Sequence, residues 1–394
     1  MTETILVLNS GSSSIKFTLF ADDAVMLDGQ VQGLGATPHI TLKSRTTGQT
    51  IDRGLTESEG ASHTAAIAAL LPLFEDDLNG RSVSAVGHRV VHGGVDHSEP
   101  LQITEDVLDD LRTLVPLAPL HQPHNIAGIE AAQTAFPEAA QIACFDTAFH
   151  RNHPWVNDTF ALPRPLYDEG VRRYGFHGLS YEYICSYLNR AHPSAYSGRL
   201  VVAHLGNGAS MCAIRDGQSI GSTMGFTALD GLPMGTRCGQ LDPGVVLYLL
   251  TTKGMTPDEV SDLLYKQSGL KGLSGISQDM RTLSESQDPK AAEAIDYYVF
   301  RLKREIGAMA AVLEGLDTLV FTGGIGENAA GIRERVCAKL AWLGVDIDTD
   351  KNCAAAETIS SPSSRVTVMV IPTNEEEMIR RHTSKLLSTV PVPA

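Results

Sequence analysis

Residues 5–20 read ILVLNSGSSSIKFTLF, and this stretch decides the fold class. An apolar run leads into a short polar turn of Ser and Gly, and a second run follows in which apolar and polar residues alternate. This pattern predicts a β-hairpin with a buried first strand and a second strand that has one buried face.

A second stretch of the same design begins at Leu200. Residues 200–214 read LVVAHLGNGASMCAI and predict another hairpin, with a Gly-Asn-Gly tip. We therefore expect an internal duplication, with two domains of like topology that each open with a hairpin. Hairpins with Gly or Asn in the turn are common, so the two hairpins alone also fit two unrelated elements.

The segments around the hairpins alternate between strand and helix patterns. Helices are predicted over residues 61–74, 105–114, 126–134, 288–313, 329–343 and 374–387. Strands are predicted from residue 84 into a loop that ends at 94, and over residues 141–146, 318–321 and 366–371, with a Gly-rich loop over 322–328. Strands that alternate with helices predict an α/β protein.

The composition is that of a globular enzyme and excludes several classes. The chain has 394 residues, 43% of them hydrophobic, and 46 acidic against 31 basic residues give a net charge of −15. This length favours two domains, and the acidic balance argues against a nucleic-acid-binding surface. No apolar run is long enough for a signal peptide or a membrane span. The six cysteines form no CxxC pair, which fits a reducing cytoplasm and argues against a zinc site.

Three Gly-, Ser- or Asn-rich loops follow strands, at residues 9–14, 206–208 and 322–328. Such loops expose backbone N–H groups, and together they suit a polyphosphate held from two domains. The sequence has no GxxxxGK[ST] motif, no protein-kinase HRD or DFG motif and no nucleophile elbow, which excludes a Walker-type NTPase and argues against a hydrolase.

Several charged or polar side chains lie in or beside these loops and strand ends. The candidate cations for phosphoryl transfer are Lys16, Arg89, Arg237, Arg281 and His177, and Asp146 ends a buried strand. Each has an ordinary alternative: Lys16 as a solvated strand residue, His177 as a structural histidine and Asp146 as a turn or cap residue. His121 and His124 are not expected to form a metal pair, because Pro123 should prevent a helical face there.

Eight blocks, in order along nearly the whole chain, resemble the acetate/propionate kinase family. They are LNSGSSSIK (8–16), GHRVVHGG (87–94), FDTAFH (145–150), RYGFHG (173–178), HLGNG (204–208), MGTR (234–237), GGIGEN (323–328) and PTNEE (372–376). The resemblance implies reversible transfer of the ATP γ-phosphoryl group to acetate, which yields acetyl phosphate and ADP. It also implies Mg²⁺, with Mn²⁺ as a substitute, and a cytoplasmic homodimer with no nucleic-acid or membrane partner.

The implied fold consists of two duplicated ribonuclease H-like domains of the actin/sugar-kinase/Hsp70-like type, with the active-site cleft between them. Residues 1–150 and 375–394 would form the carboxylate-side domain, and residues 151–374 the nucleotide-binding domain. This architecture agrees with the two hairpins.

The resemblance also implies a role for each matched residue. Asn9 and Glu375 match metal-associated positions, Arg89 the carboxylate-binding arginine, Asp146 the catalytic acid, and His177 and Arg237 the transition-state stabilisers. The matched pocket for the acetate methyl group comprises Val91, Leu120, Phe176 and Ala228. The matched nucleotide contacts are Lys16, His204, Leu205, Gly206, Asn207, Gly208, Asp279, Met280, Arg281, Gly324, Ile325, Gly326, Glu327 and Asn328.

Two departures from the family pattern carry expectations. Ala228 stands where the family usually has proline, which should enlarge the methyl pocket and improve tolerance of propionate. Gln240 stands where an aspartate is usual, which should alter one hydrogen bond or charge pairing near Arg237. The alternatives are a propionate or butyrate kinase and a nucleotide-switch binding protein of the same superfamily. A dinucleotide oxidoreductase is less well supported, because a proper GxGxxG opening is missing.

Overall fold

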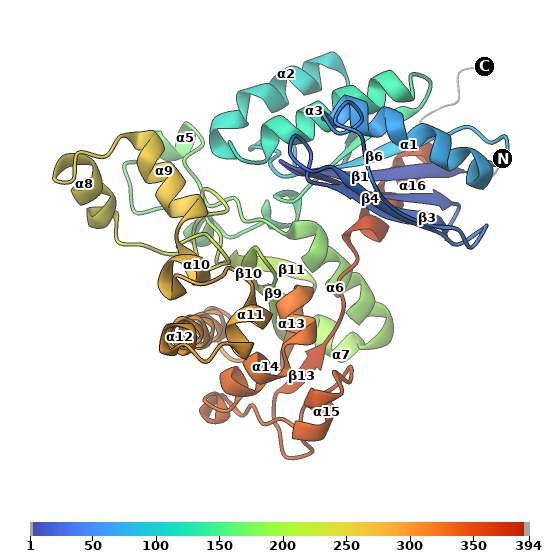
Figure 1. Cartoon of the computed structure of the whole chain (residues 1–394). Coiled ribbons are helices and arrows are strands. Elements are labelled where there is room, and N and C mark those ends of the chain that lie inside the picture. The colour runs from blue at the N-terminus through green and yellow to red at the C-terminus, as the bar shows by residue number, and fades with distance from the viewer. Residues whose placement is uncertain (1–2, 390–394) are drawn as a thin grey trace. The chain divides into compact units, whose positions relative to one another are not determined.

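The computed structural model describes residues 3–389, and Met1, Thr2 and residues 390–394 lie outside it. The chain divides into two compact units (Figure 1). Unit 1 comprises Met1–Ala148 and Asn374–Ala394, and unit 2 comprises Phe149–Thr373. The chain thus leaves unit 1 after Ala148 and returns to it after Thr373. The last five residues of the domain segment predicted over 375–394 fall outside the described residues.

Unit 1 is built on an eight-stranded sheet in the order β5-β4-β3-β2-β1-β6-β8-β7. Its strands are β1 (Thr4–Ser10), β2 (Ser14–Ala21), β3 (Ala24–Gln32), β4 (His39–Ser44), β5 (Thr50–Gly54), β6 (Ala85–Val90), β7 (Leu101–Gln102) and β8 (Ala140–Phe145). The first predicted hairpin is confirmed, because β1 and β2 pair in antiparallel fashion with Asn9 opposite Lys16. Strands β1, β6 and β8 are parallel neighbours.

Helices complete unit 1 and bury the apolar faces of its sheet. They are α1 (His63–Leu78), α2 (Glu105–Thr113), α3 (Gln122–Ala135) and α16 (Glu375–Thr389), with 3₁₀ turns η1 (Val115–Leu117) and η2 (Ala148–His150), the last of which crosses into unit 2. Helix α1 begins after Ser62, whose hydroxyl accepts a hydrogen bond from the Ala65 N–H. Its Phe74 packs against Phe17 of β2, with ring centroids 5.6 Å apart. Helix α16 contacts β1, β6 and β8.

Unit 2 repeats the central topology of unit 1. Its five-stranded sheet has the order β11-β10-β9-β12-β13. Its strands are β9 (Arg199–Leu205), β10 (Ala209–Arg215), β11 (Gln218–Ser222), β12 (Thr318–Thr322) and β13 (Thr367–Val370). The pairs β9–β10 and β10–β11 are antiparallel, like β1–β2 and β2–β3 in unit 1. The pairs β9–β12 and β12–β13 are parallel, like β1–β6 and β6–β8. The predicted second hairpin and the predicted duplication are therefore confirmed.

The helices of unit 2 include the long one predicted from the sequence. They are α4 (Trp155–Asp158), α5 (Arg164–Asp168), α6 (Gly178–Ala191), α7 (Pro193–Ser197), α8 (Pro243–Thr251), α9 (Pro257–Lys266), α10 (Gly269–Ser274), α11 (Met280–Glu285), α12 (Pro289–Val312), α13 (Gly323–Asn328), α14 (Ala330–Cys337), η3 (Ala341–Leu343) and α15 (Thr349–Cys353). Helix α12 buries Tyr298, Leu302 and Ile306, as its apolar periodicity predicts.

Two predictions about the segment after β12 are wrong. Residues 323–328 form helix α13 instead of a loop, because Gly323 adopts a φ of +77° that lets the chain turn at once from strand to helix. A Cβ at Gly323 would lie 2.8 Å from the Leu205 carbonyl oxygen. The helix predicted over 329–343 ends at Cys337, after which the chain turns to bury Leu340.

The prediction that Pro123 prevents a helical face around His124 is also wrong. Pro123 lies in the first turn of α3, where the N–H that proline lacks has no partner within the helix. His124 is therefore helical, and its ring stacks on that of His63 with centroids 5.8 Å apart. None of the helices within residues 3–389 has the length and apolar character that a membrane span requires.

Candidate active site

Three predicted site residues of unit 1 lie at the ends of neighbouring parallel strands. Asn9 is near the end of β1, Arg89 near the end of β6, and Asp146 directly follows β8. The register places Leu8 beside His88 and Val90 beside Phe145, which brings these three positions to one edge of the sheet. The carboxyl ends of parallel strands are the usual binding edge of such sheets.

The Arg89 guanidinium joins these residues into one cluster, here called the Arg89 cluster (Asn9, Arg89, Asp146 and Glu375). Its Nε and one terminal nitrogen donate to the two oxygens of Asp146, at 3.0 and 2.5 Å. The other terminal nitrogen donates to Asn9 Oδ1 at 3.4 Å, and Glu375 Oε2 lies 3.5 Å from Arg89 Nε. This two-pronged contact fixes the plane of the guanidinium.

The cluster is largely shielded from solvent and carries excess negative charge. The Asp146 side chain is 1% exposed and that of Arg89 is 18% exposed. Burial by itself lowers the pKa of Arg89, but the attraction of Asp146 and Glu375 outweighs it and raises that pKa well above its ordinary value. The guanidinium stays charged, and with two carboxylates beside it the cluster favours an added cation.

The donor set of the Arg89 cluster suits a hard divalent cation. Asn9 and Glu375 offer amide and carboxylate oxygens, the ligands that Mg²⁺ prefers. Within residues 3–389, no group of three or more His, Cys, Asp and Glu side chains forms a complete metal cage. A cation held by one or two protein oxygens together with substrate phosphates needs no such cage.

Lys16, Val91 and Leu120, three further predicted site residues of unit 1, differ in their surroundings. Lys16 is exposed on β2 and pairs with Asn9, so both side chains lie on one face of the sheet. It lines a hollow of about 480 Å³ with residues of β3, β4 and β5. Val91 is buried and its N–H donates to Asn125 Oδ1 at 3.0 Å, whereas Leu120 is half-buried just before α3.

In unit 2, two predicted histidines stack on each other. The His177 and His204 ring centroids lie 4.3 Å apart at an interplanar angle of 21°. His177 precedes α6 with a left-handed φ of 57°, and its Nδ1 hydrogen-bonds Ser210 Oγ at 2.8 Å. Ser210 Oγ is also 2.5 Å from the Tyr181 hydroxyl. A left-handed backbone at a non-glycine residue is uncommon, and here it directs the imidazole toward β10.

Arg237 and His177 both lie beside Gly208. A Cβ at Gly208 would lie 3.4 Å from His177 Nε2 and 3.7 Å from an Arg237 terminal nitrogen. That same nitrogen donates to the carbonyl oxygen of Ala228 at 3.1 Å. The structure thus brings together two predicted transition-state stabilisers and one predicted pocket residue. Phe176 is buried, and its carbonyl oxygen hydrogen-bonds His150 Nε2 at 3.0 Å.

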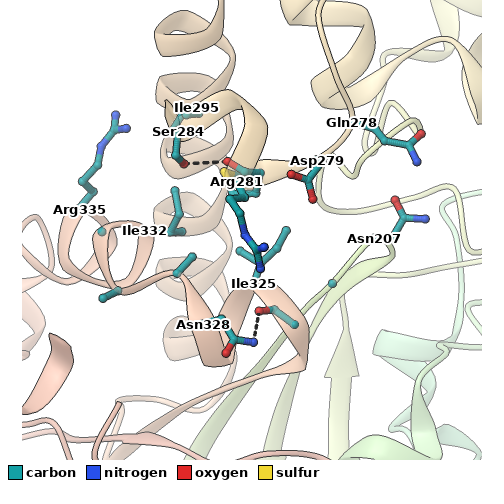
Figure 2. A pocket seen from close by; sticks show the side chains of 16 residues that line it. Asn207, Gln278, Asp279, Arg281, Ser284, Ile295, Ile325, Asn328, Ile332 and Arg335 are labelled. Carbon is teal, nitrogen blue, oxygen red and sulfur yellow. Dashed lines mark hydrogen bonds between the residues drawn. The ribbon is translucent and has the colours of Figure 1, made fainter. Parts of the chain in front are cut away.

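A cavity of about 900 Å³ in unit 2 collects most of the predicted nucleotide contacts (Figure 2). Those that line it are Gly206, Asn207, Asp279, Met280, Arg281, Gly324, Ile325 and Asn328. Figure 2 shows the Arg281 side chain reaching toward Ile325. Gly235 holds one wall in place, because its N–H donates to the Asn207 carbonyl oxygen at 3.2 Å and a Cβ there would clash with Asn207 Oδ1.

The remaining predicted nucleotide contacts do not line this cavity. His204, Leu205 and Gly326 are buried, Gly208 faces His177, and Lys16 belongs to unit 1. Glu327 accepts hydrogen bonds from the N–H groups of Gly323 (2.8 Å) and Thr373 (3.3 Å).

Sequence reasoning missed half of the cavity wall. The additional lining residues are Gln278, Ser284, Ile295, Ala329, Ala330, Gly331, Ile332 and Arg335. Ile295 lies on the predicted apolar face of α12. The other seven residues lie within seven positions of the segments 279–281 and 324–328 in the sequence. Their nearness to those segments was the available signal.

Gln240 lies beside two arginines of helix α12. Its Oε1 accepts hydrogen bonds from Arg301, at 3.2 Å, and from Arg304, both on α12. The missing carboxylate therefore alters a pairing with these two arginines of α12. Arg301 is 5% exposed and its Nε is buried with no hydrogen-bond partner.

Comparisons with known proteins agree with one another. The sequence model of the Acetokinase family matches residues 4–381. The acetate kinase of Methylocella silvestris is 55% identical over 398 residues, which cover 98% of this chain and 98% of that protein. The acetate kinase of Rhodopseudomonas palustris strain TIE-1 is 53% identical over 395 residues, with 98% of this chain and 99% of that protein covered.

Two solved structures share the fold over nearly the full length. A propionate kinase from Francisella tularensis gives a TM-score of 0.91 at 38% identity, with 97% of this chain and 99% of that chain covered. An acetate kinase from Porphyromonas gingivalis gives a TM-score of 0.87 at 37% identity, with 98% and 100% covered. These matches confirm the predicted fold class.

Proposed function

The chain belongs to the Acetokinase family, and from this premise we propose that it reversibly transfers the γ-phosphoryl group of ATP to acetate. The products of the forward reaction are acetyl phosphate and ADP. The observation that carries the proposal is the Arg89 cluster, a charged guanidinium held in plane by Asp146 at the binding edge of a parallel sheet. A nucleotide-switch protein has no need of such a carboxylate-recognising group.

The chemistry requires positioning more than a strong base. Acetate is already an anion near pH 7, because carboxyl pKa values lie around 4. One of its oxygens attacks the γ-phosphorus in line, the new O–P bond forms as the bond to the bridging oxygen of ADP breaks, and that oxygen leaves with its electron pair. The barrier is repulsion between two anions, which fixed positive charge offsets.

Within this proposal, Arg89 binds the acetate carboxylate and Asp146 holds the guanidinium in the orientation that binding needs. The nitrogen that donates weakly to Asn9, at 3.4 Å, is the edge of Arg89 that is least committed to Asp146. His177 and Arg237 stabilise the charge that develops on the transferred group, and their common approach to Gly208 supports this pairing.

The family uses a divalent metal, and we propose that Asn9 and Glu375 hold Mg²⁺ here, with Mn²⁺ as a substitute. The ion supplies neutralisation of phosphate charge when bound. The cavity of unit 2 supports the proposal that ATP and ADP bind through the segments 206–207, 279–281 and 324–328.

The methyl pocket bears on acyl-chain preference. Ala228 replaces a proline that is usual in the family, and the solved relative from Francisella tularensis is a propionate kinase. We propose that acetate and propionate are both substrates, since one methylene changes discrimination by only about 1–3 kcal/mol. A strong preference for acetate in kcat/KM would contradict this.

We also propose a cytoplasmic homodimer with helix α8 in its interface. Helix α8 reads PGVVLYLLT, yet it buries none of its side chains within the single chain. Val245, Leu247 and Tyr248 are 40%, 60% and 48% exposed. Such an apolar helix fits burial against a second copy. Leu247→Asp should shift the molar mass measured by light scattering from dimer to monomer, and an unchanged mass would refute this interface.

The decisive experiment measures acyl phosphate as its hydroxamate after incubation with ATP, Mg²⁺ and one acid. Acetate and propionate should both give product, and butyrate should give less because it needs a second added methylene in the pocket. Product from butyrate above that from acetate would favour the short-chain fatty acid kinase alternative. ATP binding with no acyl phosphate from any acid would favour a nucleotide-switch protein.

A further inference from the structure

Thr373, the last residue of unit 2, makes two hydrogen bonds that point in different directions. Its N–H donates to Glu327 Oε1 at 3.3 Å, and its hydroxyl oxygen accepts from Ser180 Oγ at 2.8 Å. The chain between Ser180 and Thr373 spans most of unit 2, so the contact belongs to the folded structure and not to a local turn. None of these contacts follows from the roles proposed above.

The Glu327 contact connects Thr373 to the nucleotide cavity. The same Oε1 accepts the N–H of Gly323, the first residue of α13, at 2.8 Å. Helix α13 contributes Gly324, Ile325 and Asn328 to the cavity wall. A change in the position of α13 therefore acts on the Glu327 carboxylate, and through it on the backbone at Thr373.

The Ser180 contact connects Thr373 to the histidine pair. Ser180 is fully buried, and its Oγ lies 2.8 Å from His204 Nδ1. A hydroxyl has one proton, and Ser180 donates it to Thr373. Ser180 Oγ must then accept from His204, which places a proton on Nδ1. His204 in turn stacks on His177 at a centroid distance of 4.3 Å.

We propose that Thr373 is a positioning residue that couples the nucleotide cavity to His177. Its hydroxyl fixes the tautomer and ring plane of His204 through Ser180. Its N–H is hydrogen-bonded to Glu327 of α13, so a shift of α13 changes the position of Thr373. This role rests on the proposed phosphoryl transfer, because it assigns His177 to the reaction. Thr373 touches neither substrate in this scheme and acts only through other residues.

Thr373→Val tests the hydroxyl alone, because valine keeps the branched shape and the backbone N–H. Without its acceptor, Ser180 should donate to His204 Nδ1 and move the ring proton to Nε2. We expect kcat to fall by about tenfold, the effect of one lost buried hydrogen bond, while KM for ATP changes by less than about twofold. Thr373→Ser is the matched control and should restore kcat.

Nitrogen NMR of His204 in the full-length protein provides a readout that a merely structural role would not change. The wild type and Thr373→Ser should show a protonated Nδ1, and Thr373→Val a protonated Nε2. An unchanged tautomer with unchanged kcat in Thr373→Val would overturn the proposal. If Thr373→Val lowers Tm, Ser180→Ala carries the same test, since it removes the acceptor of the His204 proton directly.

A double-mutant cycle tests the coupling itself. If Glu327→Ala and Ser180→Ala act through one chain, their combined loss of kcat should be smaller than the product of the separate losses. Independent, multiplicative losses would overturn the coupling. The NMR readout needs no substrate, so failure of the wild type to form acyl phosphate would refute the proposed function and leave the test of the Thr373 contact intact.

Discussion

The three corresponding parallel strands of the two units carry different side chains at their carboxyl ends. In unit 1, β1, β6 and β8 lead to Asn9, Arg89 and Asp146, which form a charged cluster. In unit 2, the corresponding β9, β12 and β13 lead to His204, Thr322 and Thr373, which are polar but carry no fixed charge. One topology therefore supplies a binding edge twice, and the side chains at that edge decide whether it recognises charge or orients a ring.

The largest effect is expected when the charge of Arg89 in unit 1 is removed. Arg89→Ala should lower kcat/KM for acetate by about 1000-fold, because it deletes the positive charge that we propose binds the substrate carboxylate. Steady-state kinetics with varied acetate measures this. Arg89→Lys keeps the charge but not the two-pronged contact with Asp146. Its kcat/KM for acetate should therefore fall less than that of Arg89→Ala but stay below that of the wild type. Nucleotide affinity of unit 2, measured with a fluorescent ADP, should stay unchanged in both variants.

The next largest effect is expected when the charge of Arg237 in unit 2 is removed. Arg237→Ala should lower kcat by about 100-fold with KM for ATP nearly unchanged, because Arg237 is assigned to charge that develops during transfer. An unchanged kcat would remove Arg237 from the mechanism. Arg335→Ala is a useful comparison, because Arg335 lines the nucleotide cavity and its loss should act mainly on KM for ATP.

A smaller effect concerns buried histidines in both units. Burial lowers the pKa of His88 in unit 1 to about 4 and that of His153 in unit 2 to about 3. Both stay neutral in the folded protein while the unfolded chain binds protons below pH 6.5, so the free energy of unfolding falls as the pH drops from 6.5 toward these values. For His88 the loss at pH 5.5 should be on the order of 1 kcal/mol.

Urea unfolding at pH 7.5 and pH 5.5 measures this loss, with each unit followed by its own probe if the two unfold separately. His88→Gln should flatten the pH dependence of unit 1 and leave that of unit 2 as it was. An equal pH dependence in the variant and the wild type would contradict the assignment to His88.

The smallest test adds charge to unit 2. Gln240→Glu keeps the length of the side chain and places a carboxylate beside Arg301 and Arg304. Because the Arg304 side is exposed, the gain should be about 0.5–1 kcal/mol, seen as a small rise in Tm. The kinetic constants should not change, and a large loss of activity would mean that this pairing does reach Arg237.

Local patterns in the sequence predicted the elements with clear periodicity. Both hairpins, helix α12 and the strand before Asp146 show it, and all four are confirmed. The sequence pattern does not predict strand β5, because this strand is almost wholly exposed and its residues show no apolar alternation. Helix α8 misleads in the opposite way, since it is apolar without being buried in the chain.

The site was predictable only in part, for a physical reason. Motif order identified Arg89 and Asp146, but their two-pronged contact depends on the register of β6 and β8, which no local pattern encodes. The hydrogen bonds of Thr373 join segments that are far apart in the sequence. Turn chemistry is also misleading here, because the Gly-rich run over 322–328 predicts a loop, whereas Gly323 begins a helix.

The return of the chain to unit 1 after Thr373 has a consequence for how the protein is made. Helix α16 contacts β1, β6 and β8, yet in the sequence it follows the whole of unit 2. The strands of unit 1 are therefore synthesised before unit 2 and α16 only after it, on the order of ten seconds or more later at about 5–20 residues per second. Until then the sheet face that α16 contacts stays uncovered, and a chain that stops before residue 374 lacks α16 and cannot complete unit 1.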